Sequence, residues 1–420
     1  MEAHVDAIPQ FIQSFADRFG TVFTREIQRE RFCQYLASLY LQTERKNTQG
    51  ISRAMVGVDD QAVHHFLLES PWDHDEMNRL RVALLDSLPQ TQSRRDGIAV
   101  LDDSGSPRRG TKIANTKRQY IGQVGKVTNG YVQVTTHYAD PDKHWPVDLS
   151  PYRPKEWTSE QKPFKTKYEI GLKLLKAARE THHLRFRVAV MDPWYGRSAE
   201  FLQRLCDEEI PFVAALEAGT KVTTKLPTDP FRDTPHKVKD ALGAFRPEDY
   251  RKVILSSSKG PMARWVVEFR GHRSRMKGKQ RFFVVVEDPN KPEEGEVWFL
   301  VTNCPREYLS AEQAVEAYHL RNWVEVGYRE AKQELGANQC VCVGEKAQVR
   351  HWLLVQAAHS LVTFLKRTGA FHGFCRRTLG SWLDHLRAVR DWLSVLFQRW
   401  QQAHPEHAQA LTLARTGFAV

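Results

Sequence analysis

The sequence predicts an α/β protein in which a mixed sheet forms the core and helical regions lie at both ends. Two short apolar runs, residues 98–101 and 186–191, have the length and composition of buried strands, and each is followed at once by an aspartate. Helical periodicity marks residues 1–92 and returns after residue 309. The stretch between, residues 217–308, is rich in further strand patterns, so we expect an inserted β subdomain there.

The order of the predicted elements defines the core more closely. Residues 119–138 alternate through Asn129-Gly130, a strong hairpin signal, so three strands in meander order are expected. The later elements are a helix at 166–180, a strand at 186–191, a helix at about 198–208 and a strand at 212–216. This β-β-β-α-β-α-β order is that of the RNase H-like fold, in which the two strands that end in aspartate lie side by side.

A chain of 420 residues is too long for one typical core. The N-terminal region combines short helices with clustered arginines, which favours a helix-turn-helix-like DNA reader, although other all-helical domains share that pattern. We expect a helical N-terminal DNA-binding region at 1–92, the first part of the core at 93–216, the inserted β-rich subdomain at 217–308, the second part of the core at 309–366 and a C-terminal helical region at 367–420.

Charge and cysteine usage limit the class of protein. The excess of 61 Lys and Arg over 50 Asp and Glu gives a net charge of +11, which favours a polyanionic partner or simply aids solubility. There is no signal-peptide pattern and no apolar run of about 18 residues, so we expect a cytoplasmic protein that contacts no membrane. The six cysteines lack disulfide-like or CxxC spacing, and the pairs His64-His65 and His182-His183 lack ligand partners at suitable spacing, so no structural zinc is expected.

Residues 310–336 predict one long helix. Ser310 and Gln313 form a capping box, and Gly336 stands where the helix would end. Beside its apolar stripe, an arc of roughly 60° carries a carboxylate, two cations and a phenol. These side chains are Tyr318, Arg321, Glu325 and Lys332.

That grouping has two interpretations. Arg321 and Glu325 could be an ordinary i,i+4 pair on an amphipathic helix. Alternatively, Glu325 is a metal ligand whose cationic neighbours hold phosphates.

The aspartates at the strand ends favour the second interpretation. Alone, Asp102 or Asp192 could simply cap a helix or a turn, but with Glu325 they form a carboxylate set suited to two divalent cations. Hard oxygen ligands favour Mg²⁺, with Mn²⁺ able to substitute. Asp103 is the alternative first carboxylate, although strand alternation points it away from Asp102.

Three motifs, LDDSG at 101–105, MDPWYG at 191–196 and Tyr318-x2-Arg321-x3-Glu325-x6-Lys332, resemble the catalytic blocks of bacterial insertion-sequence transposases of the DDE type. The resemblance extends over about residues 15–365 and is to insertion sequence family seven-hundred-and-one. It implies that Asp102, Asp192 and Glu325 are the catalytic metal ligands. It also implies that Tyr318, Arg321 and Lys332 contact DNA phosphates, that the inserted subdomain lines the DNA channel and that the protein is a homodimer on DNA.

Further cations are expected at the DNA. The turn at 270–279 is strongly basic, so we expect Arg273, Arg275 and Lys277 to contact phosphates unless they form only a solvated tip. Arg350 and His351 are candidates for outer contacts to the site or to phosphate, and residues 383–400 have a helical pattern.

The predicted function is that of a transposase that binds double-stranded DNA at terminal inverted repeats and at a target. It would use Mg²⁺ to cleave the DNA and transfer the strand. The alternatives are a catalytically silent DNA-binding protein derived from a transposase, and a metal-dependent nuclease without strand transfer.

Overall fold

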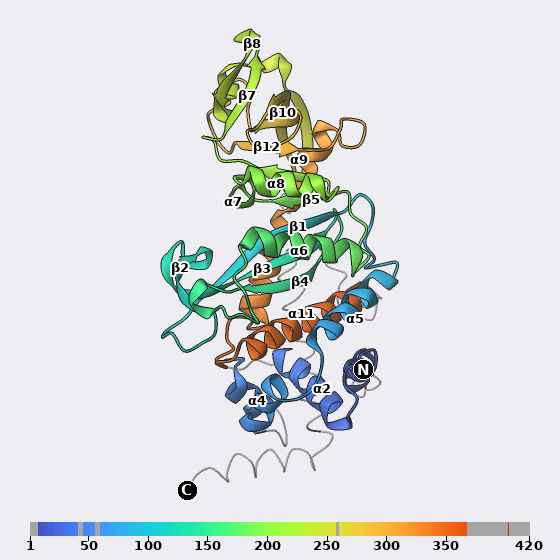
Figure 1. Cartoon of the computed structure of the whole chain (residues 1–420). Helices are drawn as coiled ribbons and strands as arrows, with labels where there is room; N and C mark the ends of the chain where they lie inside the picture. Colours follow the sequence, from blue (N-terminus) through green and yellow to red (C-terminus); the bar gives the residue numbers. More distant parts are fainter. Residues whose placement is uncertain (1–6, 41–44, 55–58, 258–259, 368–401, 403–420) are drawn as a thin grey trace.

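The computed structural model of the protein describes residues 7–40, 45–54, 59–257, 260–367 and 402 (Figure 1). The helices are α1 (Ala7–Asp17), α2 (Glu26–Tyr40), α3 (Thr48–Ala54), α4 (Asp60–Leu68), α5 (His74–Ser87), α6 (Lys167–Glu180), α7 (Pro193–Gly196), α8 (Ala199–Asp207), α9 (Ala311–Leu320), α10 (Asn322–Arg329) and α11 (Glu345–Arg367). The strands are β1 (Ile98–Pro107), β2 (Lys117–Ile121), β3 (Lys126–Ala139), β4 (His144–Tyr152), β5 (Val188–Met191), β6 (Phe212–Ala215), β7 (Lys221–Leu226), β8 (Asp229–Lys237), β9 (Arg251–Ser257), β10 (Gly260–His272), β11 (Gln280–Val286) and β12 (Trp298–Thr302).

The twelve strands form one mixed sheet. Its order is β2-β3-β1-β5-β6-β12-β11-β10-β7-β8, with β4 paired to β3 and β9 paired to β10. β1 runs parallel to β5, from Ile98 opposite Val188 to Leu101 opposite Met191, and β5 runs parallel to β6. The prediction of a mixed RNase H-like core with adjacent aspartate-bearing strands is therefore confirmed.

The strand-rich segment after β6 extends the core sheet. β12 pairs antiparallel with β6, so that Thr302 lies opposite Val213, and β11 and β10 follow outward. In Figure 1 the outermost strands, β7 and β8, lie at one end of an elongated molecule, while the N-terminal helices lie at the other. The strand-rich segment is therefore joined to the core sheet by backbone hydrogen bonds between β12 and β6.

The two faces of the sheet are covered by different helices. Along β1, Ala99 and Leu101 pack into the apolar cluster that contains α6 and α8, whereas Ile98 and Val100 pack into the cluster that contains α9 and α10. This alternation follows from the two-residue period of a strand. The residues that follow Leu101 therefore also alternate between the α6 side and the α10 side.

One predicted turn is wrong. Asn129-Gly130 lies inside β3, where Gly130 is opposite both Lys117 and Pro107. The chain turns earlier, at residues 122–125, where Gly125 has a φ of 64°. Gly130 serves close strand packing, because a Cβ at this position would lie 2.5 Å from the Ser106 carbonyl oxygen.

The strand β4 was not predicted. It contains Pro146 and Pro151, which weaken the strand signal, and its place beside β3 off the main path of the sheet tolerates them. The core therefore begins with four strands, of which β1, β3 and β4 are hydrogen-bonded neighbours.

The long helix predicted for residues 310–336 is interrupted. Its capping box and its end at Gly336, with a φ of 70°, are confirmed. At Arg321, however, the chain changes to tighter hydrogen bonds, from Arg321 N–H to the Tyr318 carbonyl and from Val324 N–H to the Arg321 carbonyl. A π-helical turn, Glu330–Glu334, follows α10. The angular positions of an unbroken helix therefore do not apply along the whole segment.

Buried arginines fasten the N-terminal helices to the rest of the chain. α11 packs against α2, α4, α5 and β4. Arg81 of α5 is fully buried and donates to the carbonyls of Pro146 and Val147 and to the side chain of Ser360. Arg350 of α11, 1% exposed, donates to carbonyl oxygens at the end of α4 and in the segment between α4 and α5, namely those of Phe66, Leu67, Ser70 and Trp72.

These contacts bear on the expectation that Arg350 and His351 contact the site or a phosphate. Arg350 donates to backbone carbonyls. Buried His351 donates from Nε2 to the Gly336 carbonyl and is hydrogen-bonded through Nδ1 to the Tyr35 hydroxyl, so both side chains are engaged within the protein and not free to reach phosphate. The helix expected at 383–400 lies outside the described residues. None of the described helices has both the length and the apolar character needed to cross a membrane.

Replacing Arg350 by Met should cost about 3 kcal/mol or more in the free energy of unfolding, because buried carbonyl groups lose their donor. Urea denaturation of the full chain measures this. Arg79→Met is the control, since Arg79 is 45% exposed and pairs with an exposed Glu76, and it should change the free energy by no more than about 0.5 kcal/mol. Equal effects of the two substitutions would contradict the structural role of Arg350.

Candidate active site

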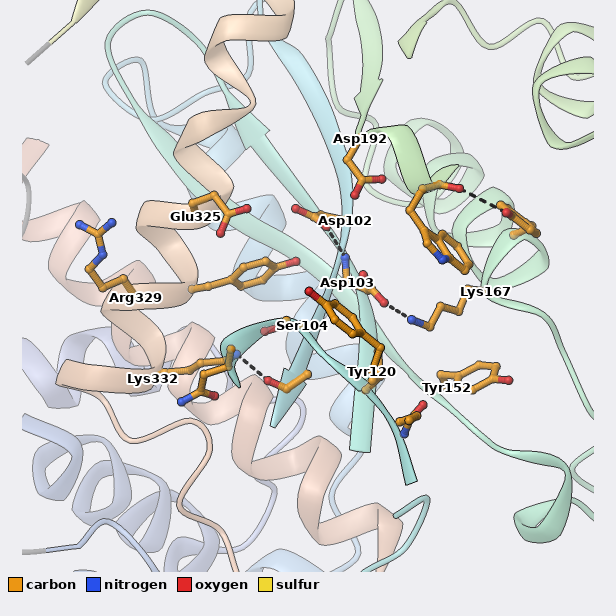
Figure 2. A pocket seen from close by; sticks show the side chains of 18 of the residues that line it. Asp102, Asp103, Ser104, Tyr120, Tyr152, Lys167, Asp192, Glu325, Arg329 and Lys332 are labelled. Carbon is orange, nitrogen blue, oxygen red and sulfur yellow. Dashed lines mark hydrogen bonds and ion pairs between the residues drawn. The ribbon is translucent and has the colours of Figure 1, made fainter. Parts of the chain in front are cut away.

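A cavity of about 790 Å³ opens beside residues 102–105 of β1 and the end of β5, where α10 passes across them (Figure 2). Carboxylates, cations and aromatic rings share its wall. The lining residues are Asp102, Asp103, Ser104, Gly105, Gln119, Tyr120, Gly122, Gln123, Val132, Tyr152, Phe164, Thr166, Lys167, Tyr168, Asp192, Trp194, Glu325, Tyr328, Arg329, Lys332 and Gln333.

Asp102 is the most enclosed of the predicted carboxylates. It follows the buried run of β1 on the α10 side of the sheet and is only 6% exposed. Its Oδ1 accepts from the Asp103 amide at 2.7 Å, and its Oδ2 lies 3.3 Å from Nη1 of Arg321. Burial raises the pKa of Asp102 well above its usual value, and the nearby Asp192 carboxylate adds to this while Arg321 opposes it. The site therefore concentrates negative charge where water is scarce.

Asp192 is held by the turn that follows β5. It caps α7, and its Oδ1 accepts from the Tyr195 amide at 3.1 Å. Gly196 lets this turn pack on β6, because a Cβ there would lie 1.8 Å from the Ala215 carbonyl oxygen. Burial raises the pKa of Asp192, although the amide hydrogen bond and Arg321 act in the opposite direction. Asp192 therefore does cap a helix, as one interpretation of the sequence expected. Its side chain nevertheless faces the same cavity as Asp102 (Figure 2).

Glu325 completes the set from the opposite wall. Its side chain is 57% exposed and points into the cavity from α10 (Figure 2). Arg321 lies between carboxylates, with Nη1 3.3 Å from Asp102 and 3.8 Å from Oε1 of Glu325. The i,i+4 pair is therefore present, but it is part of a larger arrangement in which one guanidinium faces several carboxylates.

Asp103 lies on the other side of β1. Lys167, the first residue of α6, pairs with its carboxylate (Figure 2). Asp103 also lines the cavity, yet its charge already has a cationic partner. These contacts favour Asp102 as the first metal ligand.

The donor set fits divalent cations of the magnesium type. Asp102, Asp192 and Glu325 all offer carboxylate oxygens, which hard cations prefer. Burial raises the pKa of both aspartates, and Arg321 offsets this effect only in part. A divalent cation would supply the missing positive charge.

The other members of the Tyr-Arg-Glu-Lys pattern lie at different depths. Lys332 lines the cavity, and its Nζ donates to the Gly105 carbonyl at 2.8 Å. Burial lowers its pKa to about 8, against the opposing effect of Glu325 and the aspartates. Tyr318 is 9% exposed and packs edge-on to Trp298, with the Arg321 guanidinium 5.7 Å from its ring centroid. Trp298 is therefore a core residue.

The sequence did not indicate the aromatic and cationic wall beside Asp192. Trp194 stacks on Tyr168 with ring centroids 4.8 Å apart, and Lys167 and Arg197 each lie 4.9 Å from the Trp194 centroid. The Trp-Tyr pair directly after Asp192-Pro193 was the available signal. Lys167 and Tyr168 gave no such signal, because they begin a helix that is distant from Asp192 along the chain.

The basic turn between β10 and β11 is engaged within the protein. Arg273 is 6% exposed and donates to the carbonyls of Gly196 and Arg197 at the end of α7, so in this arrangement its guanidinium is engaged by the protein, and its contact with phosphate stays a prediction. Arg275 and Lys277 remain at the surface, where they pair with Glu200 and Asp207 of α8. Arg273 instead holds the turn that positions Asp192.

Replacing Arg273 by Gln should loosen this turn, because the α7 carbonyls lose a charged donor. Hydrogen exchange of the backbone amides at 195–198 should become about tenfold faster or more. Arg275→Gln is the control, since its exposed pair with Glu200 should not affect these amides. Unchanged exchange in Arg273→Gln would show that the turn is held by other contacts.

Comparisons with known proteins agree with this geometry. The model of the DDE superfamily endonucleases matches residues 18–254, and that of the transposase DDE domain matches residues 165–361. The chain is 26% identical over 332 residues to the probable transposase for insertion sequence element IS701 of Microchaete diplosiphon, which covers 78% of this chain and 80% of the relative. The chain belongs to the DDE superfamily of endonucleases, as a DDE transposase similar to that of IS701.

Proposed function

We propose that this transposase binds the terminal inverted repeats of an insertion sequence, cleaves DNA at the element ends and joins them to a target. The observation that carries the proposal is the convergence of Asp102, Asp192 and Glu325 from β1, the end of β5 and α10 on one cavity (Figure 2). The cavity also offers cationic groups to a phosphate, so the same wall suits both metal ions and a nucleic acid backbone.

Asp102, Asp192 and Glu325 would hold two Mg²⁺ ions, for which Mn²⁺ may be exchanged in the assay. Bound there, the ions would lower the pKa of the attacking water or hydroxyl and would stabilise the oxygens that gain charge. No side-chain general base is needed for this chemistry. The role of the chain is to fix the carboxylates, which the Asp192 turn and the Asp102 hydrogen bonds do.

Two phosphoryl transfers account for the reaction. In cleavage, a water oxygen bonds to phosphorus while the bond from phosphorus to the 3′ oxygen breaks, and that oxygen leaves with a proton as a 3′-hydroxyl. In strand transfer, the 3′-hydroxyl oxygen bonds to a target phosphorus, and the 3′ oxygen of the target leaves with the proton. Both steps develop charge on the phosphate oxygens, which Arg321 would offset from its place between Asp102 and Glu325.

Other residues would hold the DNA. Lys332 would contact the DNA backbone at the cavity. Tyr318 would support the Arg321 guanidinium, which lies over its ring. Arg275 and Lys277 exchange their exposed carboxylate partners for phosphates. The N-terminal helices read the terminal repeats, and the protein acts on DNA in the cytoplasm as a homodimer.

The first test compares the native protein with Glu325→Gln on DNA that carries the ends flanking the gene. The native protein should cut and join these ends with Mg²⁺, whereas Glu325→Gln should bind them but cleave about a thousandfold more slowly, equivalent to about 4 kcal/mol in the barrier. Glu217→Gln, at an exposed glutamate beyond β6, is the control and should retain activity.

The products separate this function from its alternatives. If both proteins bind and neither cuts, the chain is a DNA-binding protein without chemistry. If the native protein cuts but never joins the 3′ end to a target, it is a nuclease.

A pH series tests Lys332. Its pKa of about 8 lies below the usual lysine value, so the free protein loses this charge as the pH rises through 8. Binding phosphate then requires uptake of a proton, and affinity for the element ends should fall by up to about tenfold per pH unit above 8. In Lys332→Arg, which stays charged, the affinity should change much less between pH 7 and 9. Parallel pH profiles would rule out Lys332 as the titrating contact.

A further inference from the structure

A second group of metal-ligating side chains lies outside the active site. His144 of β4, Glu330 at the start of the π-helical turn and His359 of α11 place one ligand atom each within 4.8 Å of one another. Nε2 of His359 is 3.0 Å from Oε2 of Glu330, and Nε2 of His144 is 3.9 Å from the same oxygen. Their exposed fractions are 2%, 0% and 0% for His359, Glu330 and His144. The group is therefore a core feature.

The burial of Glu330 needs compensation. Its Oε1 has no hydrogen-bond partner among the described residues, although the residue is fully buried. A carboxylate in such surroundings is costly unless a positive charge is close, and a bound cation would provide one. The rings of the two histidines offer nitrogen atoms to a shared point beside the carboxylate.

The spacing of the donors suits zinc. Nitrogen and oxygen ligands lie about 2.0–2.2 Å from Zn²⁺, so donors at a tetrahedral ion are separated by roughly 3.3–3.5 Å. The two separations from Glu330, 3.0 and 3.9 Å, bracket this range. Two histidines and one carboxylate are also a donor set that zinc accepts, whereas magnesium prefers oxygen donors.

Neighbouring groups orient both histidines. The His144 ring stacks on Trp323 with centroids 4.6 Å apart and an angle of 18°. Nδ1 of His359 lies 3.5 Å from the Thr363 hydroxyl, which directs Nε2 toward Glu330. Support of this kind at the second ring nitrogen is usual for histidines that bind metals.

We infer that His144, Glu330 and His359 form a buried structural Zn²⁺ site, separate from the catalytic carboxylates. The site joins β4, the segment that carries Glu325 and Lys332, and α11. Cysteine and histidine spacing predicted no structural zinc, because this site uses no cysteine and its ligands come from distant parts of the chain. The π-helical turn that begins at Glu330 is an irregularity often found at functional positions.

The test is the metal content of the untagged full-length chain, purified without chelator and measured by inductively coupled plasma mass spectrometry. About one zinc per chain is expected, and Co²⁺ exchanged into the site should give the visible absorption of a low-coordinate nitrogen and oxygen site. His359→Gln and Glu330→Gln should each lose the zinc. His182→Gln is the control, since His182 also lies near a carboxylate, Asp148 at 3.4 Å, and it should keep the metal.

Stability gives a second readout that does not depend on the variants. Removal of zinc by a chelator should lower the unfolding temperature of the native protein by several degrees, and added Zn²⁺ should restore it. Zinc retained by His359→Gln and Glu330→Gln would place the ion elsewhere. A native protein that neither contains zinc nor binds one added equivalent would overturn the inference and leave the group as a buried hydrogen-bonded pair.

Discussion

The parallel pairing of β1 with β5 is the interaction on which the active site depends, because it brings Asp102 and Asp192 to the same edge of the sheet. Burial at this poorly hydrated edge raises the pKa of both aspartates, and the Asp192 carboxylate adds to the effect at Asp102. Arg321 partly offsets this from the opposite wall, with Nη1 3.3 Å from Oδ2 of Asp102. Such a charge arrangement is suited to a cation, whose positive charge would complete the balance.

The local parts of this arrangement could be predicted from the sequence. The apolar run that leads into Asp102, the capping box at Ser310 and the end of a helix at Gly336 depend on neighbouring residues, and all are present, although β1 continues past Asp102 to Pro107. The carboxylate set could be predicted because adjacent parallel strands bring the residues that follow their paired segments to the same edge of the sheet.

Other features depend on contacts between distant residues, which no local pattern reveals. Asn129-Gly130 has strong turn propensity, but pairing of β3 with both β1 and β2 overrides it. Arg273 looked like a surface cation because its neighbours are basic, while its partners are carbonyls in α7. The break at Arg321 likewise has no local signal, since residues on both sides of it, such as Tyr318 and Val324, belong to the same apolar cluster.

The buried arginines give the molecule a mechanical property. Arg81 joins α5 to β4 and α11, and Arg350 joins α11 to the segment between α4 and α5, so the N-terminal helices cannot swing freely against the sheet. Such a rigid body fixes the distance between the N-terminal helices and the cavity. A DNA duplex gripped by the N-terminal helices would meet the cavity at a fixed number of base pairs from the gripped sequence. The position of the cut would then be set by the dimensions of the fold, independently of the bases at the cut itself.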